Sequence, residues 1–370
     1  MTDRLLLLLA ALTATACGGQ RETSCCQHGA REGSMTPTTI RERRLAATEI
    51  ADAVWRAGRT AHYVAAGAAE HEARAALVPA LLAAARGGAV DASRLTSLAE
   101  VAGMTLERWR VDAATYYAVI EPAARGAGAY FVRLSPAAAA GEGEVLLEAP
   151  HAYFDKGTGE IAARLFFTAG DWPPPRAFFT NTVHRFRPSP EVRVQTGDSP
   201  SDVCHNPDHQ FTTATVAFAR ATARARVIQL HGFADRSDQE GEDDREGEDP
   251  RDGERGRDAG GDRARRTVAA APSAVVSAGD RRGSSPLSAA IAAGLDAALG
   301  GVARYPETSH ELGGTTNVLV LALARVPGAR FVHVELSSQL RRRLRDPAPI
   351  ADFARPLLAE DGAGLAEAPP

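Results

Sequence analysis

Three short blocks of the sequence place histidines and carboxylates directly after runs of apolar residues. The first block contains His151 and Asp155, the second contains His231, and the third contains Glu335. Each block follows a segment with the composition of a buried strand. Because sites in open α/β sheets form beyond the carboxyl ends of parallel strands, we expect these four side chains to meet in one crevice. Two imidazoles and a carboxylate form a ligand set typical of catalytic zinc.

The spacing predicts a role for each of the four side chains. His151 and Asp155 lie four residues apart in one loop, and Gly157 permits a tight bend into the next helix. His231 would supply the third ligand of a single Zn2+ ion and leave the fourth position to water. Glu335 is the candidate catalytic base, because a carboxylate beside zinc can take a proton from the activated water. The sequence therefore predicts a one-zinc hydrolytic site.

Each of these residues also has a structural interpretation when it is taken alone. Asp155 could belong to a turn that caps a helix, and His231 could be a buried histidine with satisfied hydrogen bonds. Glu335 could pair with an arginine such as Arg341. The metal hypothesis therefore depends on all three blocks occurring together.

Further polar residues are candidates for the surroundings of the site. Arg185 follows a predicted strand and is our candidate for a cation that binds an oxyanion or a substrate carboxylate. Asn317 could contact substrate or stabilise the glycine-rich turn before it. The segment His205–His209 could bind a metal or form a rim, although Pro207 opposes the helical placement that would align its histidines. Cys204 is expected to be a buried thiol.

Composition excludes several other classes of protein. The chain has 370 residues, a formal net charge of −4, 44% hydrophobic and 24% charged residues, which is typical of soluble globular chains. It lacks a broadly basic character, so we expect no nucleic-acid partner. Four cysteines are too few for a disulfide-built scaffold. The sequence also has no phosphate-binding glycine motif and no Gly-x-Ser-x-Gly nucleophile elbow.

Strand and helix patterns alternate through most of the chain. Strands are expected at 115–120, 129–134, 144–149, 176–183, 227–230, 274–277 and 330–334, and helices at 157–167, 211–224, 288–299 and 337–344. This alternation predicts a three-layer α/β/α domain over 105–358 with a mostly parallel or mixed central sheet. Residues 39–98 are rich in Ala, Arg, Glu and Leu, which favours an additional N-terminal helical hairpin.

The chain ends have a different composition from the α/β domain. Residues 1–16, followed by Cys17, resemble the signal peptide of a bacterial lipoprotein, with an apolar run at Leu5–Leu12. The resemblance implies cleavage before Cys17, lipidation of its thiol and a cell-envelope, extracytoplasmic protein that contacts the membrane through this anchor only. An ordinary secretory signal, or a start at Met35, is the alternative. We expect a flexible tether at 17–38, a disordered charged insertion at 235–266 and a disordered tail at 359–370.

Taken in order, the blocks resemble the poly-γ-glutamate hydrolase family, within the superfamily of carboxypeptidase A-type zinc peptidases. The matching pieces are His151-x3-Asp155, Gly157-Thr158-x-Glu160-Ile161-Ala162, Gln229-Leu230-His231-Gly232, Asn317, and Val334-Glu335-Leu336-Ser337. Asp155 stands where the family has a glutamate, one residue closer to the histidine. The resemblance implies Zn2+-dependent hydrolysis of an amide bond in a peptide-like substrate, such as a γ-glutamyl polymer or a cell-wall peptide. A non-catalytic envelope lipoprotein with this fold and a zinc esterase or deacylase remain alternatives.

Overall fold

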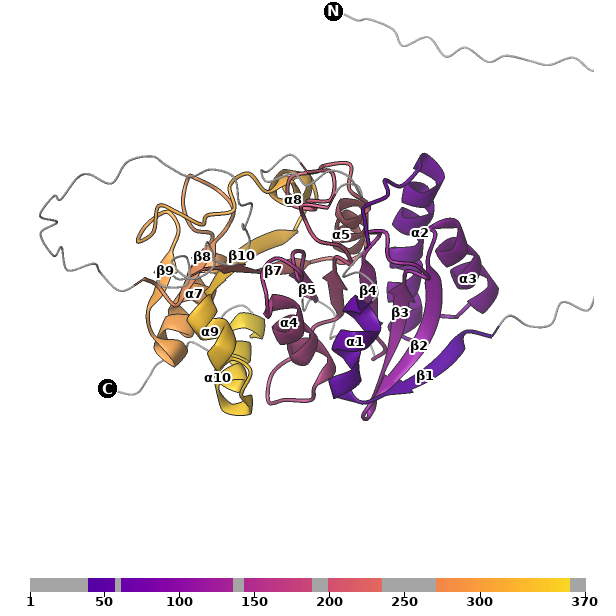
Figure 1. Ribbon diagram of the computed structural model, residues 1–370, viewed down its shortest axis with the longest axis horizontal. Helices are drawn as coiled ribbons and strands as arrows, with labels where there is room; N and C mark the ends of the chain where they lie inside the picture. The colour runs from indigo at the N-terminus through magenta and orange to yellow at the C-terminus, as the bar shows by residue number, and fades with distance from the viewer. Residues whose placement is uncertain (1–38, 57–60, 136–142, 188–198, 235–270, 360–370) are drawn as a thin grey trace, which may run out of the picture. The chain divides into compact units, whose positions relative to one another are not determined.

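The strands pair into one mixed sheet of ten strands in the computed structural model, which describes residues 39–56, 61–135, 143–187, 199–234 and 271–359 (Figure 1). In chain order they are β1 (Arg41–Leu45), β2 (Thr105–Val111), β3 (Ala114–Ile120), β4 (Ala129–Arg133), β5 (Val145–Ala149), β6 (Ala177–Thr180), β7 (Arg226–Phe233), β8 (Ala274–Ser277), β9 (Val302–Arg304) and β10 (Arg330–Ser337). Their order across the sheet is β1-β2-β3-β4-β6-β5-β7-β10-β8-β9. The central strands β6, β5, β7 and β10 are parallel, so the predicted α/β class with a mostly parallel or mixed sheet is confirmed.

Helices cover both faces of this sheet (Figure 1). The first face carries α1 (Ile50–Trp55), α4 (Thr158–Phe167), α7 (Pro286–Leu299), α9 (Ser338–Arg343) and α10 (Pro347–Leu358). The second face carries α2 (Ala68–Ala85), α3 (Ala92–Val101), α5 (Gln210–Arg220) and α8 (Val318–Leu323). A short 3-10 helix, η1 (Ala47–Glu49), precedes α1.

Each face of the sheet has its own apolar core because side chains alternate along a strand. Phe178 and Phe179 are neighbours in β6, yet Phe178 packs with Phe131 on the first face and Phe179 packs with Phe211 on the second. Burying a side chain of this kind contributes about 1.5–3 kcal/mol relative to exposing it. A strand that is buried on both faces must lie between two layers of helices, as this one does.

The direction of winding changes at β5. The chain leaves β5 through α4, on the first face, and enters β6 on one side of β5. It then passes through α5, on the second face, and enters β7 on the other side of β5. Such a switch point leaves a crevice beyond the carboxyl ends of the strands, where ligands of open α/β sheets bind.

The predicted N-terminal helical hairpin over 39–98 is wrong in its first part. Residues 41–45 form β1, which pairs in parallel with β2 at the edge of the sheet. The helix propensities of Arg, Glu and Leu differ from those of other residues by only tenths of a kcal/mol, so pairing with an available strand edge decides the conformation. In addition, α1 packs on the first face and α2 and α3 on the second, so α1 and α2 do not form a hairpin.

The remaining predicted elements are present with small changes at their ends. The strand expected at 176–183 is limited to β6, since the chain turns after Thr180, and the helix expected at 211–224 ends at Arg220. Sequence patterns did not predict the strand β2, the short elements β9 and α8, or the helix α10. The signal peptide with Cys17, the tether, the charged insertion and nearly all of the C-terminal tail lie outside the described residues.

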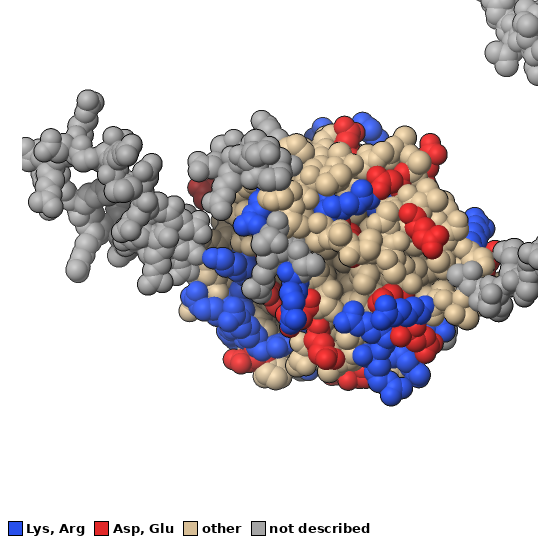
Figure 2. Space-filling model, turned by 45° about the vertical axis from the view of Figure 1, so that its right-hand side comes forward, with Lys and Arg blue, Asp and Glu red and all other residues tan. Residues whose placement is uncertain are grey.

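Helix hydropathy and the distribution of surface charge are the two features relevant to binding partners. In the part of the chain that the structure describes, no helix is both long and apolar enough to cross a membrane. Figure 2 shows one face of the molecule, on which basic and acidic side chains lie next to one another in the lower part and uncharged atoms cover much of the upper part. Charges of both signs therefore lie side by side in the lower part of this face.

Candidate metal centre

The blocks singled out in the sequence meet at the carboxyl ends of the central strands. His151 lies in the turn that follows β5, His231 lies in β7, and Glu335 lies in β10 directly opposite His231 in the parallel register. The amide N–H of Asp155 donates to the carbonyl of His151 at 2.7 Å, which folds the loop back on itself. Gly157 has a φ of +95°, a value that favours glycine, and it allows α4 to begin at the next residue.

One carboxylate oxygen faces both histidines. Oδ2 of Asp155 lies 3.7 Å from Nδ1 of His151 and 3.3 Å from Nδ1 of His231. The three side chains are 2%, 5% and 3% exposed for His151, His231 and Asp155. Two ligands of a tetrahedral zinc ion, each about 2.0–2.1 Å from it, lie roughly 3.3–3.4 Å apart. The distance from Oδ2 of Asp155 to Nδ1 of His231 matches this separation, and its distance to Nδ1 of His151 is slightly longer.

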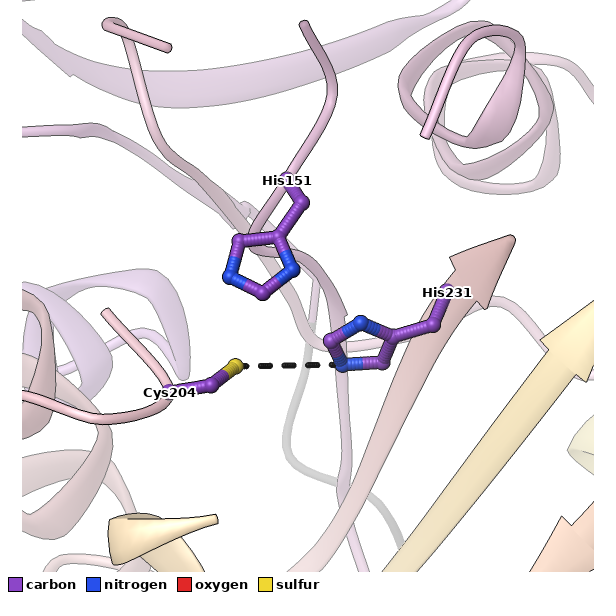
Figure 3. Close-up of side chains that lie close together, drawn as sticks. All are labelled: His151, Cys204 and His231. Atoms are coloured by element: carbon purple, nitrogen blue, oxygen red, sulfur yellow. Dashed lines mark hydrogen bonds between the residues drawn. The ribbon is translucent and has the colours of Figure 1, made fainter. Parts of the chain in front are cut away.

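A thiol completes this buried cluster. Sγ of Cys204 lies 3.9 Å from Nε2 of His231, and ligand atoms of His151, Cys204 and His231 all lie within 4.8 Å of one another (Figure 3). The cluster of two histidines and one cysteine could hold a metal ion, and it shares both histidines with the Asp155 arrangement. Because Nδ1 of His231 faces Asp155 and Nε2 faces Cys204, the two arrangements use different nitrogens of the same ring.

Asp202 is the centre of a buried network that sequence patterns did not indicate. Its Oδ1 lies 2.9 Å from Nε2 of His151 and accepts the amide N–H of Cys204 at 3.1 Å. Its Oδ2 accepts from Nε of Arg185 at 2.9 Å and lies 3.1 Å from Nδ1 of His205. Asp202 is fully buried, and these four partners supply the hydrogen bonds that an ionised carboxylate requires.

Arg185, predicted to bind substrate, lies beside the metal cluster. Its Nε and Nη2 donate to Asp202, and its Nη1 lies 3.3 Å from Nδ1 of His151. The guanidinium also lies over the rings of Phe154 and Phe186, with its central carbon 5.2 and 4.9 Å from their centres. These contacts hold the cation at the edge of the site. Contact with a substrate stays a prediction.

Asn317 is the other residue predicted to contact substrate. Both the oxygen and the nitrogen of its side-chain amide form hydrogen bonds within the protein. Its Oδ1 accepts the N–H of Leu319 and so caps α8, while its Nδ2 donates to Oε1 of Gln229 at 2.7 Å. Gln229 in turn donates from Nε2 to Oε2 of Glu148 at 2.7 Å, and its Oε1 lies 3.2 Å from Nε2 of His231. Asn317 is therefore linked to the site through Gln229, which contacts His231.

Glu335 lies at the edge of the cluster. Only one of its two carboxylate oxygens has a partner among the described residues. Oε1 lies 3.1 Å from Nε2 of His333, whose ring lies over that of His231 with 4.3 Å between the ring centres. Oε2 is buried and has no hydrogen-bond partner among the described residues. A carboxylate oxygen without a partner can accept a hydrogen bond from a bound molecule.

Burial sets the protonation of several of these groups. Burial and the neighbouring His333 lower the pKa of His231 to about 4, so this imidazole is neutral at pH 7 and carries a lone pair. Burial alone would raise the pKa of Asp155, but hydrogen bonds from His151 and His231 outweigh it and lower the pKa. Burial raises the pKa of the Cys204 thiol and that of Glu148, the latter to about 7.

Comparisons with known proteins give only a distant likeness in fold. No family model matches the sequence, and no curated protein matches it. An N-formylglutamate amidohydrolase from Ralstonia eutropha matches with a TM-score of 0.32 and 13% identity, over 59% of this chain and 92% of that one. A gene product of Agrobacterium tumefaciens matches with a TM-score of 0.31 and 15% identity, over 58% and 85% of the two chains. A likeness this distant carries no argument about chemistry.

The segment His205–His209 does not form a metal site of its own. His205 points to Asp202 and, through Nε2, to Oγ1 of Thr316 at 3.1 Å, which places it at the rim of the cluster. His209 is buried at the start of α5, where its Nδ1 accepts the N–H of Phe211. The two rings therefore have separate structural partners.

Sequence reasoning missed Asp202 and His333 and gave Cys204 no role in the site. A signal for the first was present, because Asp202 and Cys204 belong to a polar, turn-rich segment that leads into α5. His333 lies two residues before Glu335, so both side chains share one face of β10. Neither signal identifies a contact without knowledge of which loops meet.

Proposed function

We propose that this protein is a zinc-dependent hydrolase of amide or peptide bonds. The observation that supports the proposal best is that Oδ2 of Asp155 lies within 3.7 Å of Nδ1 of both His151 and His231, beside a carboxylate with one oxygen that has no partner among the described residues. These three residues would hold the ion. When bound, zinc would supply a Lewis acid that polarises a carbonyl and activates water.

The protein side chains would provide the proton transfers and charge stabilisation. Glu335 would accept a proton through Oε2 and return it to the leaving amine, while His333 holds its other oxygen. Arg185, fixed by Asp202 next to His151, would place a positive charge near the developing oxyanion. The burial of all three ligands would keep bulk water away from these charges.

The substrate class and the location follow from the sequence resemblances. Peptide-like polymers, such as γ-glutamyl chains or cell-wall peptides, are the proposed substrates, because the ordered blocks around His151, His231 and Glu335 resemble the poly-γ-glutamate hydrolases. A lipid on Cys17 would hold the protein at the cell envelope, on the extracytoplasmic side, and would be its contact with the membrane.

A closed metal site without catalysis is the second candidate. Cys204 lies 3.9 Å from Nε2 of His231, so His151, Cys204 and His231 form an alternative ligand set that uses the other nitrogen of His231 in place of Asp155. Cysteine ligands are common in structural zinc sites, which are closed, whereas catalytic sites keep one position open. The protein would then be a non-catalytic envelope module that uses the metal for stability.

The experiment that tests the proposed function combines metal analysis with an assay of amine release. The purified protein should contain about one zinc per chain, and His151→Ala and His231→Ala should lose it. A panel of γ-glutamyl peptides, cell-wall peptides and matched esters should show zinc-dependent release from amides. A protein that holds no zinc, or that holds zinc and cleaves neither amides nor esters, contradicts the proposal.

A further inference from the structure

We propose that the edge of the sheet formed by β1 and β2 binds the phosphate headgroups of anionic lipids through Arg44 and Arg110. This would be a second contact with the membrane, in addition to the lipid on Cys17 that the sequence predicts as the only anchor. The inference takes its biological meaning from the proposed location at the cell envelope, but it does not depend on the proposed hydrolytic reaction.

The two edge strands carry an excess of positive charge. The segments RERRL of β1 and TLERWRV of β2 contain five arginines and two glutamates, in a chain whose formal net charge is −4. Both glutamates already have an arginine partner, since Glu107 lies 3.7 Å from Arg41 and Glu42 lies 3.3 Å from Arg108. The other three arginines form no ion pair with a carboxylate in the described part of the chain.

Arg44 and Arg110 lie directly opposite each other in the parallel register of β1 and β2. Both are exposed, and both share the second face of the sheet with Glu42 and Arg108, which precede them by two residues on their strands. Like charges in opposed positions on neighbouring strands are destabilising. An anion between the two guanidinium groups would offset this repulsion, and a guanidinium suits phosphate because it donates two parallel hydrogen bonds.

A furrow runs along the same face of these strands. One hollow of about 420 Å³ has Arg108 and Arg110 in its wall. A second hollow of about 410 Å³ shares Arg108 with the first and has the apolar side chains of Ile40 and Val90 in its wall. Glu42, the partner of Arg108, is the acidic residue that both walls share. The furrow is therefore cationic at one end and partly apolar at the other, as are the headgroup and the glycerol ester region of a phospholipid in complement.

The position of this edge suits a chain that is held at its N-terminus. β1 begins at Arg41, directly after the tether that the sequence predicts, and it lies at the edge of the sheet (Figure 1). The pairs β2–β3, β3–β4 and β4–β6 are antiparallel, so β1 and β2 run opposite to β6 and β5. Arg44 and Arg110 lie near the carboxyl ends of their strands and therefore toward the end of the sheet away from His151. A headgroup bound there would leave the metal site open to substrate.

The test measures the binding of the full chain to lipid vesicles. Cys17→Ser removes the predicted lipid and is the background for every variant. Anionic vesicles contain phosphatidylglycerol and phosphatidylcholine, and neutral vesicles contain phosphatidylcholine alone. The difference between them reports the electrostatic contact, because an apolar contribution from the N-terminal segment is common to both. We expect tighter binding to the anionic vesicles, and this preference should fade as salt is raised above physiological ionic strength, where screening already acts within about 8 Å.

Two changes of opposite sign assign the contact to the furrow. Arg44→Gln together with Arg110→Gln should weaken binding to anionic vesicles about 25-fold, at about 5-fold for each positive charge removed. Glu42→Gln should strengthen this binding, because it removes the acidic residue from the furrow and releases Arg108 from its ion pair. If the double variant fails to fold in a thermal unfolding measurement, Glu42→Gln decides.

Arg282→Gln together with Arg325→Gln is the matched control, because it removes two exposed arginines that lie outside the edge strands. This variant should bind nearly as the background does. Equal binding to both kinds of vesicle, an equal loss in the two double variants, or no gain in Glu42→Gln would overturn the inference. Binding of inorganic phosphate without binding to anionic vesicles would exclude the lipid as the ligand. A protein that binds anionic vesicles but cleaves no amide would contradict the proposed function alone.

Discussion

His333 and Glu335 share one face of β10, with Nε2 of the histidine 3.1 Å from Oε1 of the carboxylate. The second oxygen of Glu335 has no partner in the described part of the chain. A buried polar atom without a partner costs free energy, typically about 1–3 kcal/mol. Such an atom next to a possible metal site is the arrangement expected where a reacting molecule supplies the missing hydrogen bond.

Replacing Glu335 by glutamine should abolish hydrolysis and leave zinc in place. Glutamine has nearly the same shape but cannot accept and return the proton, and the loss of a general base lowers rates by about 100- to 10,000-fold. Amine release should fall by this factor while zinc content and thermal stability remain at the wild-type level. A variant that retains full activity would assign the proton transfer to another group.

The substitution Cys204→Ser distinguishes a catalytic site held by Asp155 and the two histidines from a closed site that includes the thiol of Cys204. In the proposed site the ion would lie on the Nδ1 side of His231, whereas Cys204 faces Nε2, so we expect unchanged zinc affinity and activity. Cobalt-substituted wild-type protein should show no thiolate-to-cobalt absorption band. A strong band that disappears in Cys204→Ser, together with loss of metal, would favour the closed, non-catalytic site.

His209 should make the fold sensitive to acid. The ring is fully buried against Tyr63, with 4.8 Å between ring centres, and burial together with Arg74 lowers its pKa to about 3. In the unfolded chain a histidine binds a proton below about pH 6.5, which the folded protein resists. The contribution of neutral His209 to the free energy of unfolding is therefore complete above pH 6.5. It is lost as the pH falls below this value, by about 1.4 kcal/mol per pH unit.

The measurement compares denaturant unfolding of the wild type and His209→Asn between about pH 6.5 and 5. Asparagine can still accept the N–H of Phe211 at the start of α5, so the variant keeps the helix cap and loses the titration. Its stability should fall less steeply with acid than that of the wild type. His310→Asn, a change at an exposed histidine, should reproduce the wild-type slope, whereas equal slopes for all three proteins would show that His209 does not carry this effect.

Local patterns in the sequence were sufficient for most of the sheet and for the roughly correct placement of His151, Asp155, His231 and Glu335. Apolar runs such as that before His151 identify buried strands, because a strand covered on both faces carries mostly apolar side chains. The position of a polar residue after such a run then places it at a known end of the sheet. The same reasoning failed for β1, since an edge strand with one buried residue has no pattern that distinguishes it from a polar helix.

The sequence by itself determined which side chains could reach the carboxyl edge of the sheet, because strand direction and side-chain alternation are local properties of the chain. Only the tertiary structure decided which of them touch. Asp202 reaches His151 across 51 positions of sequence, and Asn317 reaches Gln229 across 88. Contacts of this range depend on strand order and on the paths of loops, and a hydrogen bond requires its two atoms within about 3.2 Å, a precision that residue type and spacing do not specify.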